Sequence, residues 1–207
     1  SFADFDRKAQ PKAFDVMKDI LADEEGQPGS ALLLSPNVFG VGKTHLLTAL
    51  VNPEVETRCP AVLIGSEIWK NSLPAYYVTE TALLARIRAT FHHDPDSEAE
   101  TEEQVYGFFG NTQLLLVDDV GKVRPHDMSF LQSVYFRIVD DRYSNEMPLI
   151  LASNLSPAEF EAHVGGAVAD RLREMCGPNI VVMKGKSFRR EVLHTEGVGP
   201  TSEPPAG

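Results

Sequence analysis

Two kinds of segment alternate along this chain. Short runs of apolar, β-branched and aromatic residues have the length of buried strands. Between them, apolar residues recur every three or four positions, as on one face of a helix. The runs that predict strands are residues 31–35, 60–65, 75–79, 113–117, 148–153 and 180–183. The segments that predict helices are residues 11–22, 45–50, 80–91, 102–109, 127–143 and 168–175, with a further start at Ser156-Pro157-Ala158-Glu159.

This alternation predicts an α/β domain with a mainly five-stranded parallel sheet between helices. In the helix over 80–91, Leu83, Leu84, Ile87 and Phe91 form one apolar stripe. A chain of 207 residues is long enough for one substantial core. We expect one domain over residues 1–195 and a disordered tail over residues 196–207, because the end is rich in Gly and Pro.

The first apolar run leads into a loop that is typical of phosphate binding. Residues 37–44 read Asn-Val-Phe-Gly-Val-Gly-Lys-Thr, with Asn37 where the pattern G-x-x-x-x-G-K-[ST] begins with glycine. Asparagine is one of the few other residues that tolerates a positive φ, so the loop can still form. Backbone N–H groups of such a loop and of the following helix surround a polyphosphate. The predicted nucleotide-binding residues are Asn37, Val38, Phe39, Gly40, Val41, Gly42, Lys43, Thr44 and His45.

Lys43 is predicted to reach the outer phosphates, and the Thr44 hydroxyl is predicted to bind Mg²⁺. Asp118 and Asp119 end the buried run over residues 113–117. Asp118 can hold Mg²⁺, usually through water, while Asp119 can orient an attacking water. Asn154 follows the next run and is suitably placed to position that same water.

Each of these features also has an ordinary structural interpretation. The loop could precede an ordinary helix, the two acids could sit at a turn, and Asn154 could cap a turn. Their joint occurrence, in this order, favours a nucleotide site with ATP or ADP and Mg²⁺ as ligands. The side chain of Asp119 is one methylene shorter than the glutamate common at this position, so we expect slow hydrolysis.

Composition limits the partners and the cellular compartment that we expect for this protein. The net charge of −11 argues against a surface that coats DNA generally, because non-specific binding depends on many Lys and Arg contacts with phosphate. No apolar run approaches the length of a membrane helix, and we expect no membrane partner. Cys59 and Cys176 suggest no disulfide framework, which favours the cytoplasm.

Over about residues 2–190, the chain resembles the AAA+ ATPases of the DnaC helicase-loader and IstB group, which are P-loop NTPases. The segments that carry the resemblance are residues 2–6, 40–46, 77–79, 83–88, 115–121, 152–155, 168–172 and 186–189. Each motif alone is generic, whereas their order and spacing are fairly specific. The resemblance implies little or no helical lid after the last strand. It also implies that a loader carries an N-terminal helicase-binding domain, so we expect this chain to be the motor of a longer protein.

The resemblance assigns further roles. It implies that Asn154 is the first sensor and that Arg171 is an arginine finger, which reaches the γ-phosphate bound by a neighbouring subunit, so that the active species is an oligomer. The ordinary alternative is an arginine on an exposed helix face, and Arg173, two positions along, could be that case. The resemblance also places DNA along residues 122–143, with Lys122 and Arg124 either contacting phosphates or simply facing solvent.

Three functions remain open at this point. The first is an ATPase that assembles on single-stranded DNA and loads a replicative helicase, slow alone and dependent on the oligomer or DNA. The second is an IstB-like partner of a transposase that acts on duplex DNA. The third is a nucleotide-gated scaffold with little hydrolysis, for which Asn37 and Asp119 are the motivation. A small-molecule kinase is disfavoured, because Asp119, Asn154 and Arg171 suit attack by water.

Overall fold

The structure is a computed structural model, and it describes residues 5, 7–22, 29–50, 75–92, 99–122 and 127–185. The strand predicted over residues 60–65, the candidate DNA contact Arg124 and the tail predicted over residues 196–207 lie outside the described residues. The other predicted strands and helices fall within them. None of the described helices is long and apolar enough to cross a membrane.

Five parallel strands form one sheet in the described part of the chain. They are β1 (Ala31–Leu34), β2 (Ala75–Thr79), β3 (Leu114–Val120), β4 (Leu149–Ser153) and β5 (Ile180–Val182). Their order across the sheet is β2-β3-β4-β1-β5, and every pairing is parallel. The predicted five-stranded parallel sheet is therefore confirmed. All carboxyl ends of the strands lie at one edge, which is where parallel sheets bind ligands.

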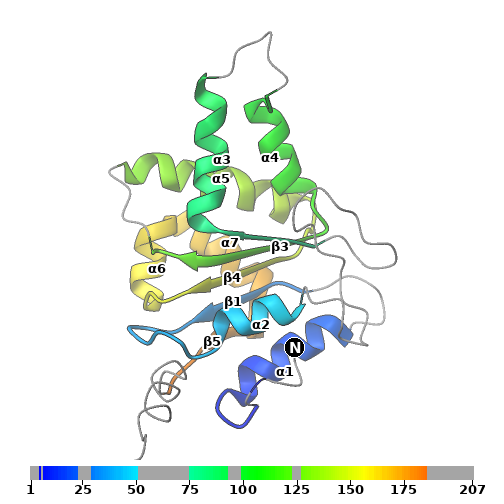
Figure 1. The fold of residues 1–207 in the computed structure, drawn as a ribbon, viewed down its shortest axis with the longest axis vertical. Helices are drawn as coiled ribbons and strands as arrows, with labels where there is room; N and C mark the ends of the chain where they lie inside the picture. The colour runs from blue at the N-terminus through cyan, green and yellow to red at the C-terminus, as the bar shows by residue number, and fades with distance from the viewer. Residues whose placement is uncertain are drawn as a thin grey trace, which may run out of the picture.

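Helices cover both faces of this sheet (Figure 1). The described helices are α1 (Pro11–Ala22), α2 (Lys43–Leu50), α3 (Glu80–Ala89), α4 (Glu102–Asn111), α5 (Met128–Ser144), α6 (Pro157–Val164) and α7 (Gly166–Cys176). Residues of α1 and α2 share one core with the sheet, and residues of α3 to α7 share the other. The predicted α/β architecture with covered faces is thus confirmed.

The strand β1 explains why the strand sequences are uniformly apolar. Successive side chains of a strand point to opposite faces. Ala31 and Leu33 pack into the core with α1 and α2. Leu32 and Leu34 pack into the core on the other face, and all four residues are at most 5% exposed. A strand covered on both faces has no position that favours a polar residue.

Capping boxes fix where two of the described helices begin. Ser156 and Glu159 form the predicted capping box, in which each side chain accepts a backbone N–H of the other, with Pro157 as the first residue of α6. Thr101 and Gln104 form a second capping box at the start of α4. These local contacts could be predicted because both partners are only three residues apart.

Two predicted details are wrong. Leu83, Leu84 and Ile87 are buried as expected, but Phe91 is 53% exposed. The α-helix ends at Ala89 and a 3₁₀ turn follows, so the apolar stripe does not continue to Phe91. In addition, β3 does not stop at Val117 but reaches Val120, with a shift in its pairing to β4 between these two residues. The shift falls on the two acids predicted to act on the nucleotide.

Candidate functional site

Three residues of the loop between β1 and α2 have positive φ. Asn37 has a φ of 56°, in the left-handed region that asparagine tolerates. Gly40 and Gly42 also have positive φ, at 76° and 100°. A Cβ atom at Gly42 would lie 2.6 Å from a ring carbon of Phe5, so glycine is required there for space as well as for φ.

Backbone hydrogen bonds hold this loop against the end of β4. The Ser35 N–H donates to the Ser153 carbonyl at 2.9 Å, and the Asn37 N–H donates to the Asn154 carbonyl at 3.2 Å. The loop after β1 and the end of β4 therefore form one unit. This unit places the side chain of Asn154 beside the phosphate loop.

Lys43 joins the phosphate loop to Asn154 directly. Its ammonium donates to Asn154 Oδ1 at 2.6 Å and to the hydroxyl of Ser35. Lys43 is only 7% exposed, so its charge is largely removed from water. A buried ammonium held by neutral oxygens gains strongly from an anion. The two oxygens thus hold Lys43 where a phosphate can take their place.

Asp118 is fixed by two donors at the end of β3. The Tyr77 hydroxyl donates to Oδ2 at 2.9 Å, and the Asp119 N–H donates to Oδ1 at 2.8 Å. Burial raises the pKa of Tyr77 well above its ordinary value, and the charge of Asp118 and the hydrogen bond to it raise that pKa further. The phenol therefore stays protonated and remains a donor.

The side-chain oxygens of Asp118 and Thr44 are of the kind that bind Mg²⁺. The carboxylate of Asp118 is 1% exposed and oriented, each of its oxygens retains a further lone pair, and Thr44 at the start of α2 is exposed. Oxygen ligands of this kind suit a magnesium ion that keeps most of its waters. Asp118 and Thr44 would hold the ion, and Mg²⁺ would neutralise charge on the phosphates.

Asp119 has a strained backbone and a partly exposed side chain. Its φ is 56°, a region that aspartate enters more readily than most residues because its short side chain can hydrogen-bond locally. The carboxylate forms an ion pair with Lys122 at 2.8 Å. Strain at such a position is typical of functional sites. The observed contact ties the candidate hydrolytic acid to the candidate DNA contact.

Ser153 joins the turn after β3 to the turn after β4. Its hydroxyl donates to the Val120 carbonyl at 2.6 Å and accepts the Leu155 N–H at 3.1 Å. Ser153 is fully buried. The turn that carries Asp119 and the turn that carries Asn154 are therefore fixed relative to one another.

Arg171 lies apart from these residues, on α7 against α5. Its guanidinium pairs with Asp140 at 2.7 Å and lies over the ring of Phe136, 4.9 Å from the centroid. The side chain is 28% exposed. Arg173 instead pairs with Asp170 and Glu161. The structure thus brings Lys43 and Asn154 into contact beside the acids of β3, and it places Arg171 on the surface between α5 and α7.

Sequence reasoning missed three residues that contact the site. Ser35 holds Lys43, Tyr77 holds Asp118, and Glu80 accepts the N–H of Gly121, two residues after Asp119. Ser35 and Glu80 come directly after β1 and β2. Polar residues that follow buried parallel strands are the signal that could have identified these two.

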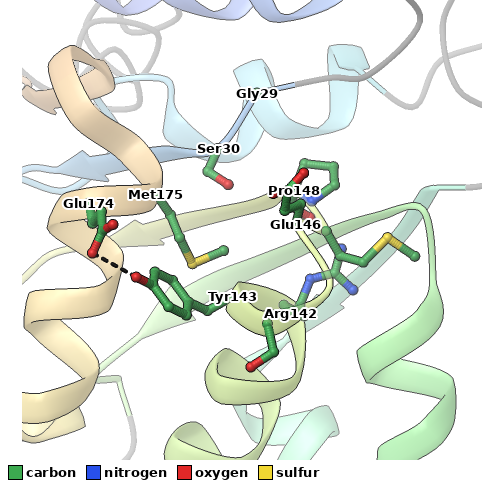
Figure 2. A pocket seen from close by; sticks show the side chains of 10 residues that line it. Gly29, Ser30, Arg142, Tyr143, Glu146, Pro148, Glu174 and Met175 are labelled. Carbon is green, nitrogen blue, oxygen red and sulfur yellow. Dashed lines mark hydrogen bonds between the residues drawn. The ribbon is translucent and has the colours of Figure 1, made fainter.

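A cavity of about 520 Å³ lies at the opposite edge of the sheet (Figure 2). It is lined by Ser30 and Pro148, which directly precede β1 and β4, and by Tyr143, whose hydroxyl donates to Glu174 at 2.8 Å. Arg142 also lines it but donates to the carbonyls of Phe109, Gly110 and Pro148. Burial lowers the pKa of Arg142 to about 9, so it stays charged at neutral pH. This cavity is remote from the phosphate loop, and its arginine connects the end of α4 to Pro148, which precedes β4.

Known proteins resemble this chain in sequence and in fold. No protein-family model matches the chain. The chain is 27% identical over 202 residues to the phage-like element PBSX protein XkdC of Bacillus subtilis (strain 168), covering 90% of this chain and 65% of that protein. It is 27% identical over 158 residues to the replicative helicase loader DnaC of Escherichia coli (strain K12), covering 76% of this chain and 56% of DnaC. The chain therefore spans less than two thirds of the length of these relatives.

Solved structures show the same fold. A crystal structure of the DnaC helicase loader matches with a TM-score of 0.63 and 20% identity, covering 85% of this chain and 90% of that chain. The replication initiator DnaA bound to AMPPCP and single-stranded DNA matches with a TM-score of 0.63 and 20% identity, covering 95% of this chain and 53% of that chain. In fold and in sequence, this chain is similar to the AAA+ ATPase domains of DnaC-type helicase loaders.

Proposed function

We propose that this chain is an ATP-hydrolysing AAA+ motor that assembles on DNA and loads a replicative helicase onto single-stranded DNA. The observation that carries the proposal is the contact between Lys43 and Asn154 at 2.6 Å, at the edge where β3 ends in Asp118 and Asp119. A phosphate-binding lysine beside an amide and two carboxylates suits attack of water on a γ-phosphate. The similarity to DnaC supports a role in replication.

The residues divide the chemistry between them. Lys43 would exchange its contacts with Ser35 and Asn154 for the outer phosphates of ATP and stabilise their growing charge. The amide of Asn154, released by this exchange, would then position the attacking water together with Asp119. Asp118 and Thr44 would hold Mg²⁺ on the phosphates.

Arg171 would complete the site of a neighbouring copy. Its contacts are with Asp140, Phe136 and Tyr143, all on α5, and it is partly exposed. A guanidinium supplies a fixed charge and paired donors, which suits the oxygens of a transferring phosphoryl group. The active species would then be an oligomer whose sites lie between subunits.

Single-stranded DNA is the polymer that the start of α5 suits best. Phe91 is 53% exposed and lies edge-on to Phe130, with ring centroids 5.5 Å apart. Arg88 lies over the ring of Phe130 at 5.1 Å, and Met128, two residues before Phe130, is 38% exposed. Sites for single strands combine aromatic side chains, on which bases stack, with arginine. Lys122 would contribute a phosphate contact before α5.

Replacing Lys122 with alanine is expected to raise turnover without DNA and to weaken the stimulation by DNA. Lys122 holds the carboxylate of Asp119 at 2.8 Å, and a DNA phosphate that bound Lys122 would release it. The increase should not exceed about fivefold, since an exposed ion pair contributes about 1 kcal/mol or less. Phosphate release with and without a single-stranded oligonucleotide measures both effects. Lys122→Arg keeps the charge and should behave like the wild type, whereas lower basal turnover in Lys122→Ala would contradict this role.

One assay can test both the preference for single-stranded or duplex DNA and the hydrolysis of ATP. Phosphate release is measured with Mg²⁺ and ATP in the presence of a single-stranded oligonucleotide or of its duplex, at one salt concentration. Greater stimulation by the single strand supports the helicase-loader function. Greater stimulation by the duplex supports the IstB-like function with a transposase as partner. ATP binding without phosphate release under either condition, or with the partner, would overturn the ATPase and leave a nucleotide-gated scaffold.

We also place the protein in the cytoplasm. Cys176 is a free thiol buried in the core, and its burial raises its pKa to about 12, so it stays protonated and unreactive. A replication motor acts where DNA and ATP are found. Fractionation of the host cell would test this placement.

A further inference from the structure

Glu80 is a fully buried carboxylate that connects four elements. It is the first residue of α3 and directly follows β2. Its Oε2 accepts the backbone N–H of Gly121 at 2.9 Å. Its Oε1 accepts the hydroxyl of Tyr135 on α5 at 2.8 Å and contacts Nε2 of His163 on α6 at 2.7 Å. Its exposure is 0%.

The bond to Gly121 fixes the turn that carries Asp119. Asp119 and Gly121 have φ values of 56° and 83°, and the Lys122 N–H donates to the Asp119 carbonyl at 3.0 Å to close the turn. A Cβ atom at Gly121 would lie 2.3 Å from Leu155, so the turn also packs tightly on the end of β4. Ser153 holds the same turn through the Val120 carbonyl. The backbone of Asp119 is therefore held by Glu80 on one side and by Ser153 on the other.

An acidic residue in the first turn of a helix is common, because it interacts well with the helix dipole. That explanation is insufficient for Glu80, since the cap of α3 is the side chain of Thr79 and the carboxylate of Glu80 points to other elements. Burying a carboxylate is costly unless hydrogen bonds compensate it. Burial raises the pKa of Tyr135 well above its ordinary value, and the charge of Glu80 raises it further, so the phenol remains a donor.

We propose that Glu80 is a positioning residue for ATP hydrolysis, which acts by accepting the Gly121 N–H and thereby holds Asp119 in its left-handed conformation. This inference rests on the proposed ATPase function. Glu80 touches neither phosphate nor water in this role. Its effect should therefore fall on the turnover number and not on the affinity for nucleotide.

The three partners of Glu80 should accept a glutamine at this position but not an aspartate. Of the three partners, the Gly121 N–H can only donate. The hydroxyl of Tyr135 can donate or accept, and so can the imidazole of His163 in its neutral form. In Glu80→Gln, the amide oxygen can accept from Gly121 while the NH₂ group donates to Tyr135 and His163. In Glu80→Asp the charge is kept, but the side chain is one methylene too short to reach all three partners. The length of the side chain, and not its charge, should decide activity.

The experiment compares kcat, KM and nucleotide affinity for these variants of the whole chain. Glu80→Asp should lose about tenfold or more in kcat, because small displacements of catalytic groups are costly, with nucleotide affinity within about twofold of the wild type. Glu80→Gln should retain kcat within about threefold, since it keeps the acceptor. Tyr135→Phe, which removes a donor from the other carboxylate oxygen, is the matched control and should keep kcat. Equal losses in Glu80→Gln and Glu80→Asp, or a loss in Tyr135→Phe as large as that in Glu80→Asp, would overturn the proposal.

Two further measurements separate positioning from general destabilisation. In a chain that already carries Asp119→Ala, adding Glu80→Asp should lower kcat no further, because Glu80 acts through Asp119. An additional loss of about tenfold there would contradict the proposal. Hydrogen exchange of the Gly121 amide, followed by NMR, should be faster in Glu80→Asp than in Glu80→Gln, and equal rates would overturn the assigned contact. This amide measurement needs no ATP, so it stands even if the wild-type chain releases no phosphate and the ATPase proposal fails.

Discussion

Replacing Lys43 with alanine is expected to lower kcat/KM for ATP by about a hundredfold or more, the scale on which removing one donor to a developing charge reduces turnover. The ammonium is 7% exposed, and a polyphosphate would offer it anionic oxygens in place of the neutral oxygens of Ser35 and Asn154. Without it, the backbone of the phosphate loop alone would bind the anion. Titration with a fluorescent nucleotide measures the loss of nucleotide affinity, and a phosphate-release assay measures the loss of turnover.

The fold should survive this substitution. The Ser35 hydroxyl can donate to the Val38 carbonyl at 2.9 Å or to Asn154 Oδ1 at 3.2 Å, so it keeps a partner without Lys43. The melting temperature without ligand should change little, while the increase that Mg²⁺ and ATP cause in the wild type should disappear. Lys18→Ala on the exposed side of α1 removes the same charge and serves as the control. Unchanged nucleotide affinity in Lys43→Ala would remove this loop from the nucleotide site.

The contact between Lys43 and Asn154 implies an order of events. In the structure, the amide oxygen that would position water is occupied by the ammonium that would bind phosphate. The γ-phosphate would therefore have to draw Lys43 away before Asn154 is free for water. Binding and water positioning are linked in this way through one hydrogen bond at 2.6 Å.

Much of the fold could be predicted because its signals are local. Uniformly apolar runs such as 149–152 indicate strands covered on both faces, and the capping box of Ser156 and Glu159 joins residues only three apart. The positive φ of Asn37 could also be predicted, since the spacing of the loop requires it and asparagine tolerates it. The predicted burial of Phe91 is wrong because the helical period was extended past Ala89, where the α-helix ends.

The rest of the site depends on contacts between distant parts of the chain. The partners of Glu80 are 41, 55 and 83 residues away, and no spacing rule connects them. Likewise, Lys43 and Asn154 are 111 residues apart, and their contact follows only from the pairing of β1 with β4. Sequence motifs predicted which residues lie at this edge of the sheet, but the order of the strands decides which of them touch.

Replacing Arg171 with alanine is expected to lower kcat by about a thousandfold if the residue acts as an arginine finger. In the structure its guanidinium contacts Asp140, Phe136 and Tyr143 on α5, none of which belongs to the proposed nucleotide site. Nucleotide affinity should stay within about twofold, since the group would act on the transition state. The loss of an exposed pair with Asp140 should cost about 1 kcal/mol or less in stability, so the fold should be kept.

A mixture of Arg171→Ala and Lys43→Ala chains tests whether the residue acts across subunits. Each chain alone should be inactive, because one lacks the finger and the other lacks the phosphate-binding lysine. In an equal mixture of head-to-tail oligomers, about one quarter of the interfaces should join an intact loop to an intact finger, and activity should recover to about that fraction. Arg173→Ala is the matched control, two positions along α7 and paired with Asp170 and Glu161, and it should keep kcat within about twofold. A mixture that stays inactive while both chains still assemble would exclude a finger supplied by the neighbouring subunit.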